Sequence, residues 1–232
     1  MNKNKQETLN DLYYEMLDKA EKSNNYKLIS KNSYNNFVDI LKEKANSIIQ
    51  NKTLVVNLFA GPGAGKSTLA SGIFYELKLR DISCELATEY AKDLVWENRA
   101  KAINNQIYIF GKQHHRINRL LGEVDVIVTD SPLLLTSVYN KSNNILNMLA
   151  YSEHKKHLSF NCFITRSKPY HEIGRLQTEK EAISIDNEIR NMLNSYMIEY
   201  ISYFGNNDGK ERIVDQILKI LNVINPKYDG KT

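Results

Sequence analysis

The sequence predicts an α/β domain in which a parallel sheet carries helices on both faces. Short apolar runs alternate with amphipathic segments between residues 53 and 224, and a glycine-rich loop joins the first run to the first helix. Strands that alternate with helices favour a parallel sheet with crossover connections. Ligands of such sheets bind beyond the carboxyl ends of the strands, so we expect the functional site at that edge.

Two amphipathic helices are expected before the first strand, over residues 6–20 and 34–50, because apolar side chains recur there at helical spacing. They could pack on the domain, form a homodimer contact or cover a substrate, and simple packing is the plainest of these readings. We therefore divide the chain into an N-terminal helical extension, residues 1–50, and a main domain, residues 51–232.

The run from residue 53 to 60 is suited to a buried strand, and the loop "AGPGAGKST", residues 60–68, follows it. Ala60 stands where this loop pattern usually has glycine, and Lys66 follows the last glycine. Glycines let backbone N–H groups turn inward around an anion, and the next helix adds its positive end. The loop, called the P-loop below, is therefore expected to bind the phosphates of a nucleotide. Its predicted nucleotide-binding residues are Gly61, Gly63, Ala64, Gly65, Lys66, Ser67 and Thr68.

The rest of the chain repeats the strand and helix pattern. One strand is expected to end near residue 89, and three more are expected over residues 124–130, 159–165 and 200–205. Helices are expected after the P-loop and over residues 91–121, 178–193 and 211–224. The long helix over 91–121 has a predicted buried stripe that includes Ile107, Phe110 and Ile117. The helix over 178–193 has a predicted apolar stripe at Ala182, Ile185, Ile189 and Leu193. This order gathers Ala60, Glu89, Asp130 and Arg166 at one edge of the sheet, where four strands end.

Asp130 is a candidate Mg²⁺ ligand together with the Ser67 hydroxyl, because an acid at the end of the strand beside a P-loop can bind the metal directly or through water. The alternative is a helix-capping aspartate ahead of Pro132. The histidine pair His154 and His157 has metal-like spacing without an evident third ligand, and we place it on a solvated helix face instead.

Glu89 could accept the proton of an attacking hydroxyl, whereas a phosphate acceptor needs cationic side chains more than a base. Lys92 and Arg99 lie near it in sequence and could bind an anionic acceptor, although both are often solvated side chains, as Glu89 can be. Arg166 is a further candidate for substrate binding, and Arg175 lies in the expected loop 168–175. A loop that closes with an arginine could neutralise the transferring phosphoryl group, so Arg175 is a candidate catalytic residue. Trp96 and Tyr90 could stack on a base or pack in the core.

Composition sets weaker limits. The chain has 31 basic and 27 acidic residues and a net charge of +4, which does not by itself require a nucleic-acid partner. Cys84 and Cys162 fall in predicted buried strands, which is typical of a reduced, cytoplasmic protein. The sequence has neither an apolar segment long enough to span a bilayer nor the apolar stretch of a signal peptide, so no membrane partner is expected.

The succession "GPGAGKST", "TEYAKDLVWE", "VDVIVTDSP" and "KPYHEIGRLQTEKEAISIDNEI" resembles the P-loop nucleoside and nucleotide kinases, and most closely the small kinase-like ATP-binding proteins of tailed phages. The resemblance covers about residues 50–225, without the N-terminal helices. It implies ATP and Mg²⁺, a three-layer fold with a mobile lid, and an acceptor near Glu89. Related kinases act on nicotinamide riboside, on deoxynucleosides or their monophosphates, or on hydroxymethylated pyrimidines in phage DNA. A phage-encoded protein of this kind would work in the host cytoplasm.

Two classes of function remain at this point. The first is a kinase in which Lys66, Glu89, Asp130 and Arg175 carry catalysis and a nucleoside, a nucleotide or a modified DNA base is the acceptor. The second is a nucleotide-driven switch or DNA-associated ATPase in which water is the acceptor and a partner responds to the bound state. The kinase is favoured, since no sensor arginine, oligomer-forming motif or accessory domain is evident in the sequence. A hydroxyl acceptor is slightly favoured over a phosphate because of Glu89.

Overall fold

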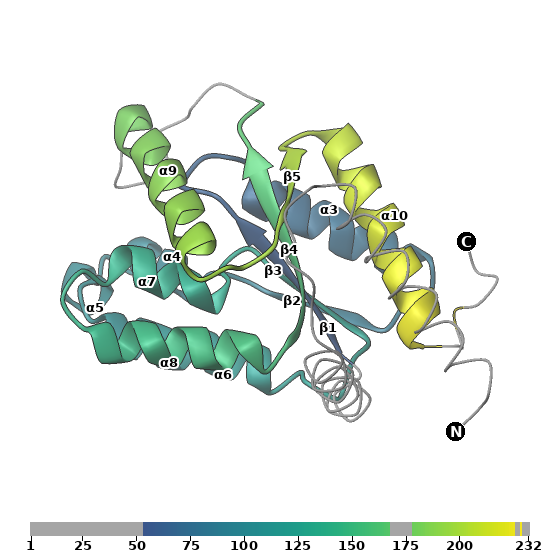
Figure 1. Ribbon diagram of the computed structural model, residues 1–232, viewed down its shortest axis with the longest axis horizontal. Coiled ribbons are helices and arrows are strands. Elements are labelled where there is room, and N and C mark those ends of the chain that lie inside the picture. Colours follow the sequence, from purple (N-terminus) through teal and green to yellow (C-terminus); the bar gives the residue numbers. More distant parts are fainter. Residues whose placement is uncertain (1–52, 168–177, 226–227, 229–232) are drawn as a thin grey trace, which may run out of the picture. The chain divides into compact units, whose positions relative to one another are not determined.

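A five-stranded parallel sheet forms the centre of the domain in the computed structural model, which describes residues 53–167, 178–225 and 228 (Figure 1). The strand order is β2-β3-β1-β4-β5, and every neighbouring pair runs parallel. The strands are β1 (Leu54–Phe59), β2 (Cys84–Ala87), β3 (Val126–Thr129), β4 (Leu158–Thr165) and β5 (Ile201–Phe204). The predicted parallel α/β sheet is thus confirmed, with all five expected strands present.

The strand β1 lies in the middle of the sheet because its sequence, LVVNLF, is apolar on both faces but for one asparagine. All six of its residues are buried. The exception, Asn57, donates a hydrogen bond from Nδ2 to Oδ1 of Asn161 on the neighbouring β4, at 3.1 Å. A central strand of this kind has no solvated side, so its two faces need helices above and below.

Helices cover both faces of the sheet and give the expected three layers (Figure 1). One face carries α3 (Lys66–Leu79) and α10 (Asn207–Ile224), whose buried residues share one apolar core with β1 and β3. On the other face, α6 (Gln106–Asn118) and α8 (Asn144–Lys155) contribute to a second core, and α9 (Glu179–Ser195) contributes to a third. The apolar stripe predicted for α9 is confirmed at Ala182, Ile189 and Leu193.

The single helix predicted over residues 91–121 is wrong, because three helices take its place. They are α4 (Tyr90–Trp96), α5 (Ala100–Ile103) and α6. Asn98 adopts a left-handed conformation with φ 55° after α4, and the Asn105 side chain accepts a hydrogen bond from the backbone N–H of Tyr108 to cap α6. Asparagine side chains compete with helical backbone bonds in this way. The restart also changes the buried stripe, so Phe110 and Ile117 are buried as expected but Ile107 is 63% exposed.

Three further elements between β3 and β4 are absent from the prediction: the 3₁₀ helix η1 (Leu133–Leu135), α7 (Thr136–Tyr139) and α8. Helix α8 corrects the placement of His154 on a solvated face, since this side chain is only 3% exposed and its ring lies edge-on to Phe59. No group of three or more His, Cys, Asp or Glu side chains able to hold a metal ion occurs among the described residues.

The predicted helices over 6–20 and 34–50, with their suggested homodimer contact, lie outside the described residues. The same holds for the whole of the loop 168–175, including the predicted lid residue Arg175. Cys84 and Cys162 are buried and free, as expected. Within the described parts of the chain, no helix has the length and apolar character needed to cross a membrane.

Candidate functional site

The P-loop connects β1 to α3 at the carboxyl edge of the sheet. Gly63 and Gly65 have φ values of 76° and 95°, which is the left-handed region that glycine enters without strain. Gly65 is the residue immediately before α3, so the loop's conformation leads directly into a helix N-terminus. Backbone N–H groups at such a terminus are free to bind an anion, as the sequence predicts.

The Lys66 side chain contacts the backbone of its own loop. Its Nζ donates hydrogen bonds to the carbonyl oxygens of Ala60, at 2.7 Å, and Gly61, at 3.1 Å. Burial lowers the pKa of Lys66 from its ordinary value, while the nearby carboxylates of Glu89, Asp130 and Asp186 act in the opposite direction. An ammonium group is therefore held beside the P-loop by carbonyl oxygens and surrounded by acids.

The same interactions show that residues after different strands lie close together at one edge of the sheet, as predicted. The charges of Glu89 after β2, Asp130 after β3 and Arg166 after β4 all affect the pKa of Lys66. These side chains therefore gather around the P-loop, as a parallel sheet with this strand order requires. Their catalytic and binding roles stay predictions.

Asp130 follows β3 and is almost fully buried, at 3% exposure. Its Oδ1 atom is buried and makes no hydrogen bond with any residue that the structure describes. A buried carboxylate oxygen without a partner is costly, and a hard cation or its water ligands would satisfy it. Ser67, in the first turn of α3, offers the hydroxyl that a P-loop uses for Mg²⁺. The two residues therefore fit the predicted metal.

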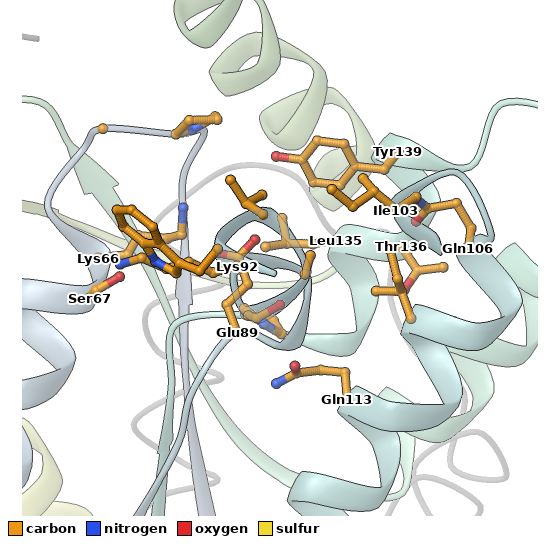
Figure 2. Close-up of a pocket in the computed structure, with 18 of the residues that line it drawn as sticks. Lys66, Ser67, Glu89, Lys92, Ile103, Gln106, Gln113, Leu135, Thr136 and Tyr139 are labelled. Atoms are coloured by element: carbon orange, nitrogen blue, oxygen red, sulfur yellow. The ribbon is translucent and has the colours of Figure 1, made fainter. Parts of the chain in front are cut away.

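A pocket of about 340 Å³ begins at the P-loop and continues past Glu89 toward α5, α6 and α7 (Figure 2). Its wall at the P-loop includes Gly63, Gly65, Lys66, Ser67 and Thr68. The predicted nucleotide-binding residues Gly61 and Ala64 are buried and are not part of this wall. Further from the P-loop the wall is formed by Lys92, Val95, Trp96, Ile103, Gln106, Ile109, Gln113, Leu135, Thr136 and Tyr139.

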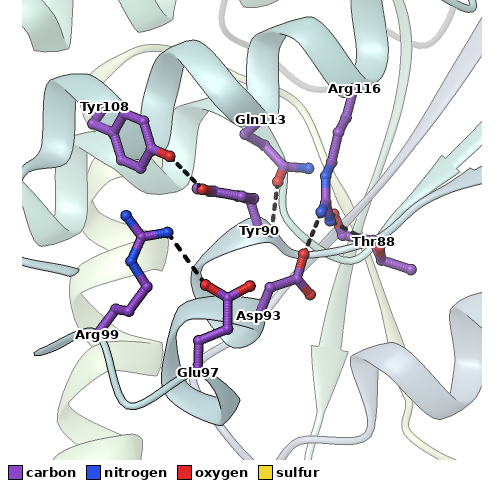
Figure 3. A network of polar contacts seen from close by, with 8 residues as sticks. All are labelled: Thr88, Tyr90, Asp93, Glu97, Arg99, Tyr108, Gln113 and Arg116. Carbon is purple, nitrogen blue, oxygen red and sulfur yellow. Dashed lines mark hydrogen bonds and ion pairs between the residues drawn. The ribbon is translucent and has the colours of Figure 1, made fainter. Parts of the chain in front are cut away.

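Glu89 lies between two residues that α6 holds in place (Figure 3). The Arg116 guanidinium donates to the carbonyl oxygen of Thr88 at 3.0 Å, and the backbone N–H of Tyr90 donates to Oε1 of Gln113, also at 3.0 Å. Arg116 forms an ion pair with Asp93 on α4 as well. These contacts fix the start of α4, and with it the backbone from which the Glu89 side chain projects.

The Glu89 carboxyl has a raised pKa. Burial is the main cause, the charge of Lys66 opposes it and the charge of Asp130 adds to it. A raised pKa makes a carboxylate a stronger base, which suits a residue that accepts a proton. The position and the environment are therefore compatible with the predicted role.

The predicted cationic side chains are not all brought to the pocket. Lys92 lines it, but Arg99 lies outside its wall and pairs with Glu97 at 3.3 Å, with both side chains 53% exposed. Arg166 forms an ion pair with Asp186 instead. Of the predicted base-stacking residues, Trp96 lines the pocket and is 62% exposed. Tyr90 turns away toward Tyr108, and the two hydroxyl oxygens lie 2.7 Å apart.

Asp186 on α9 is an important residue that the sequence prediction missed. Its Oδ1 accepts the backbone N–H of Gly61 at 2.6 Å, and its Oδ2 accepts Nε of Arg166 at 2.7 Å. A β-carbon on Gly61 would come within 2.5 Å of the carbonyl oxygen of Ala182, so only glycine allows this approach. Its position, one turn after Ala182 in the predicted apolar stripe, was the available signal, since an acid there needs a buried partner.

The far wall of the pocket was also missed. Gln106, Gln113, Thr136 and Tyr139 come from α6 and α7, and neither helix was predicted with its correct bounds. Uncharged side chains of this kind carry no sequence signal of function, because they are common on any helix. Only the tertiary arrangement identifies them as pocket residues.

Comparisons with known proteins give one family and a set of similar structures. A family model described as an AAA domain matches residues 55–212, which is more than half of the chain. Shikimate kinase from Acinetobacter baumannii in complex with shikimate aligns at 11% identity and a TM-score of 0.40, over 77% of this chain and 97% of that chain. Shikimate kinase from Bacteroides thetaiotaomicron aligns at 14% identity and a TM-score of 0.39, over 73% and 98%. A search of curated proteins found no match.

Proposed function

The chain belongs to the AAA domain family, and from this premise we propose that it is an ATP-dependent kinase. Its acceptor is a nucleoside- or nucleotide-like molecule, and a hydroxyl group of that molecule receives the γ-phosphate. The acceptor is either a free small molecule or a modified base in DNA, such as a hydroxymethylated pyrimidine.

One observation carries this proposal: the pocket that starts at the P-loop continues past Glu89 into a space with its own wall (Figure 2). A nucleotide switch or an ATPase needs only a water molecule beside the terminal phosphate. A kinase needs room for a second organic molecule next to that phosphate. The wall from α4 to α7 supplies this room, and Glu89 lies between the two parts.

The residues of the P-loop bind the nucleotide. Backbone N–H groups at the start of α3 contact the phosphates, and Lys66 exchanges its bonds with the Ala60 and Gly61 carbonyls for bonds with phosphate oxygens. Ser67 and Asp130 are the residues that would hold Mg²⁺. When bound, the metal neutralises the negative charge that develops on the phosphate oxygens.

Glu89 serves the acceptor. Its carboxylate takes the proton from the acceptor hydroxyl as that oxygen forms a bond to the γ-phosphorus. The bond from the γ-phosphorus to the bridging oxygen breaks at the same centre, so ADP leaves with the electron pair. Lys66 stays beside these oxygens and stabilises their charge, while the apolar wall of the pocket excludes competing water.

A screen of phosphoryl transfer tests the proposal. The full-length chain is incubated with ATP and Mg²⁺ and with nucleosides, nucleoside monophosphates or DNA that contains hydroxymethylated pyrimidines, and each reaction is analysed for a phosphorylated acceptor by mass spectrometry. The proposal predicts ADP and a phosphate ester in equal amounts with at least one acceptor. Hydrolysis of ATP to inorganic phosphate at one rate with every acceptor would favour the ATPase or switch.

A further inference from the structure

Three charged side chains lie in the described wall of the pocket. The cations are Lys66 at the P-loop and Lys92 on α4, and the acid is Glu89. Figure 2 shows all three on one side of the pocket. The other described wall residues are uncharged, so the charge that this wall presents to a ligand comes from these three groups.

Phosphoryl transfer places opposite demands on the two ends of the pocket. The transferred group carries negative charge on its three equatorial oxygens, and this charge has to be stabilised while the group moves to the acceptor. Lys66 and the residues that would hold Mg²⁺ lie at the P-loop, on the ATP side. On the acceptor side, Glu89 is a carboxylate until it takes the proton, so it repels the incoming phosphoryl group. A cation beside Glu89 would remove this conflict.

Lys92 has the position that such a cation needs. Glu89 is the residue immediately before α4 and Lys92 lies in the first turn, three residues later, so the two side chains share one face of the helix start. Burial raises the pKa of Glu89, and the charge of Lys92 is among those that oppose this effect. Lys92 is exposed and forms no ion pair with any residue that the structure describes. Its ammonium group can therefore turn toward a ligand.

The arginines considered for this part of the site have carboxylate partners. Arg166 pairs with Asp186 at 2.7 Å. Arg99 pairs with Glu97 and lies outside the pocket wall. Among the cations predicted from the sequence for the acceptor side, and within the described residues, Lys92 is therefore the one that lines the pocket.

The helix that carries Lys92 gains nothing from its charge. The first turn of a helix has free N–H groups and the positive end of the helix dipole, so it favours acids over cations. A residue that contradicts such a local preference often serves function. An uncharged residue in place of Lys92 should therefore leave the fold at least as stable.

We infer that Lys92 is a catalytic residue that stabilises the transferred phosphoryl group from the acceptor side. The inference rests on the proposed kinase function and differs from the acceptor-binding role predicted from the sequence. As the acceptor oxygen bonds to the γ-phosphorus, the bond to the bridging oxygen breaks and the acceptor proton moves to Glu89. Lys92 donates an N–H hydrogen bond to an equatorial oxygen and gives up no proton. Lys66 acts on the same group from the ATP side.

Steady-state kinetics with the acceptor that the screen identifies tests this role. Lys92→Met removes the charge at similar length, so kcat should fall by about 10²-fold, while the KM of the acceptor changes by less than about threefold. Lys92→Arg keeps a cation and should recover at least about tenfold of the lost rate. Lys101→Met is the control, because Lys101 is an exposed lysine of α5 outside the wall, and it should behave as wild type.

A mimic of the transition state gives a second readout. ADP with tetrafluoroaluminate, a flat mimic of the transferred phosphoryl group, is titrated into the full chain with Mg²⁺ and the same acceptor. Lys92→Met should bind this mimic at least about tenfold more weakly than wild type and bind a non-hydrolysable ATP analogue normally. Its midpoint of thermal unfolding should be unchanged or slightly higher, whereas a structural role for Lys92 predicts a lower midpoint.

The outcomes separate this inference from the proposed function. An unchanged kcat in Lys92→Met would overturn it, and a raised acceptor KM with unchanged kcat would make Lys92 an acceptor-binding residue instead. In both cases ester formation by the wild-type chain still supports the kinase. If the wild-type chain releases only inorganic phosphate, the same variants are compared in ATP hydrolysis. Slower hydrolysis in Lys92→Met would then support the role of Lys92 and contradict the kinase, and equal hydrolysis would contradict both.

Discussion

Lys66 shows how one side chain can be ready for a ligand before the ligand arrives. Its Nζ is already bonded to the carbonyl oxygens of Ala60 and Gly61, at 2.7 and 3.1 Å. In the proposed function, an incoming phosphate replaces these two carbonyl oxygens. Burial lowers the pKa of Lys66, and the charges of the three acids near it act against this effect.

Glu89 is the residue that distinguishes a hydroxyl acceptor from a phosphate acceptor. Glu89→Gln keeps size and removes the proton acceptor, so kcat with a hydroxyl acceptor should fall by about 10²-fold or more while ATP affinity changes little. Steady-state kinetics with separately measured nucleotide binding checks this. Unimpaired kcat would show that Glu89 is not the base.

The buried His154 makes stability depend on pH. Burial, followed by the charges of His157 and Lys155, lowers the pKa of His154 from 6.5 to about 4. Between these values the unfolded chain binds a proton that the folded chain excludes, so the fold loses stability as the pH falls below 6.5. The expected share of His154 in this loss is about 2 kcal/mol at pH 5 relative to pH 7.

Urea unfolding of His154→Leu at pH 7 and pH 5 measures this contribution. The variant should lose less stability on acidification than the wild-type chain, by about 2 kcal/mol. His115 on α6 is exposed, and His115→Leu provides the control for the substitution itself. Equal pH dependence in wild type and His154→Leu would contradict the buried, neutral histidine.

At the level of elements, α9 is hydrogen-bonded to the P-loop. Thr178 and Glu181 form a capping box at its start, and one turn further along Asp186 accepts bonds from Gly61 and Arg166. Arg166, in turn, donates to the carbonyl oxygen of Ala182 at 3.1 Å. The end of β4, the P-loop and α9 therefore meet in one buried ion pair.

Removing this ion pair should affect both stability and nucleotide binding. Asp186→Asn removes the buried carboxylate charge that pairs with Arg166, so we expect a loss of about 3 kcal/mol in unfolding free energy. ATP affinity should also weaken, because asparagine offers one acceptor oxygen for the two donors, the Gly61 N–H and Arg166 Nε, that the carboxylate satisfies. Urea unfolding and calorimetric titration with the ATP analogue measure the two effects.

Glu188 on the same helix provides the matched control. It pairs with Lys141 at the surface, where both side chains are largely exposed, and Glu188→Gln should change stability by less than about 1 kcal/mol. If Asp186→Asn is as mild as Glu188→Gln, the buried pair does not hold the P-loop.

At the level of the whole molecule, the strand order β2-β3-β1-β4-β5 explains why distant residues meet. The parallel strands β1 to β4 end at one edge, and the residues after them, from Ala60 to Arg166, surround the P-loop. This much could be predicted from the sequence, because buried parallel strands have continuous apolar runs and the P-loop has a distinctive spacing.

The remainder of the site could not be predicted because it depends on tertiary contacts. The breaks at Asn98 and Asn105 separate α4, α5 and α6, and they decide which side of α6 faces the pocket. Asp186 and Gln113 are ordinary helix residues until the fold brings them against Gly61 and Tyr90. His154 is expected on a solvated helix face, but it is 3% exposed and its ring contacts Phe59.

The most direct test of the proposed kinase measures where the γ-phosphate of ATP goes in the wild-type chain and in Lys66→Ala. Phosphorus NMR of the reaction distinguishes a phosphate ester from inorganic phosphate, and Lys78→Ala, an exposed lysine of the same helix, is the control. Wild type and Lys78→Ala should form the ester, and Lys66→Ala should be slower by several orders of magnitude with an almost unchanged midpoint of thermal unfolding. Near-normal ester formation by Lys66→Ala, or inorganic phosphate as the product of the wild-type chain with every acceptor, would contradict the account.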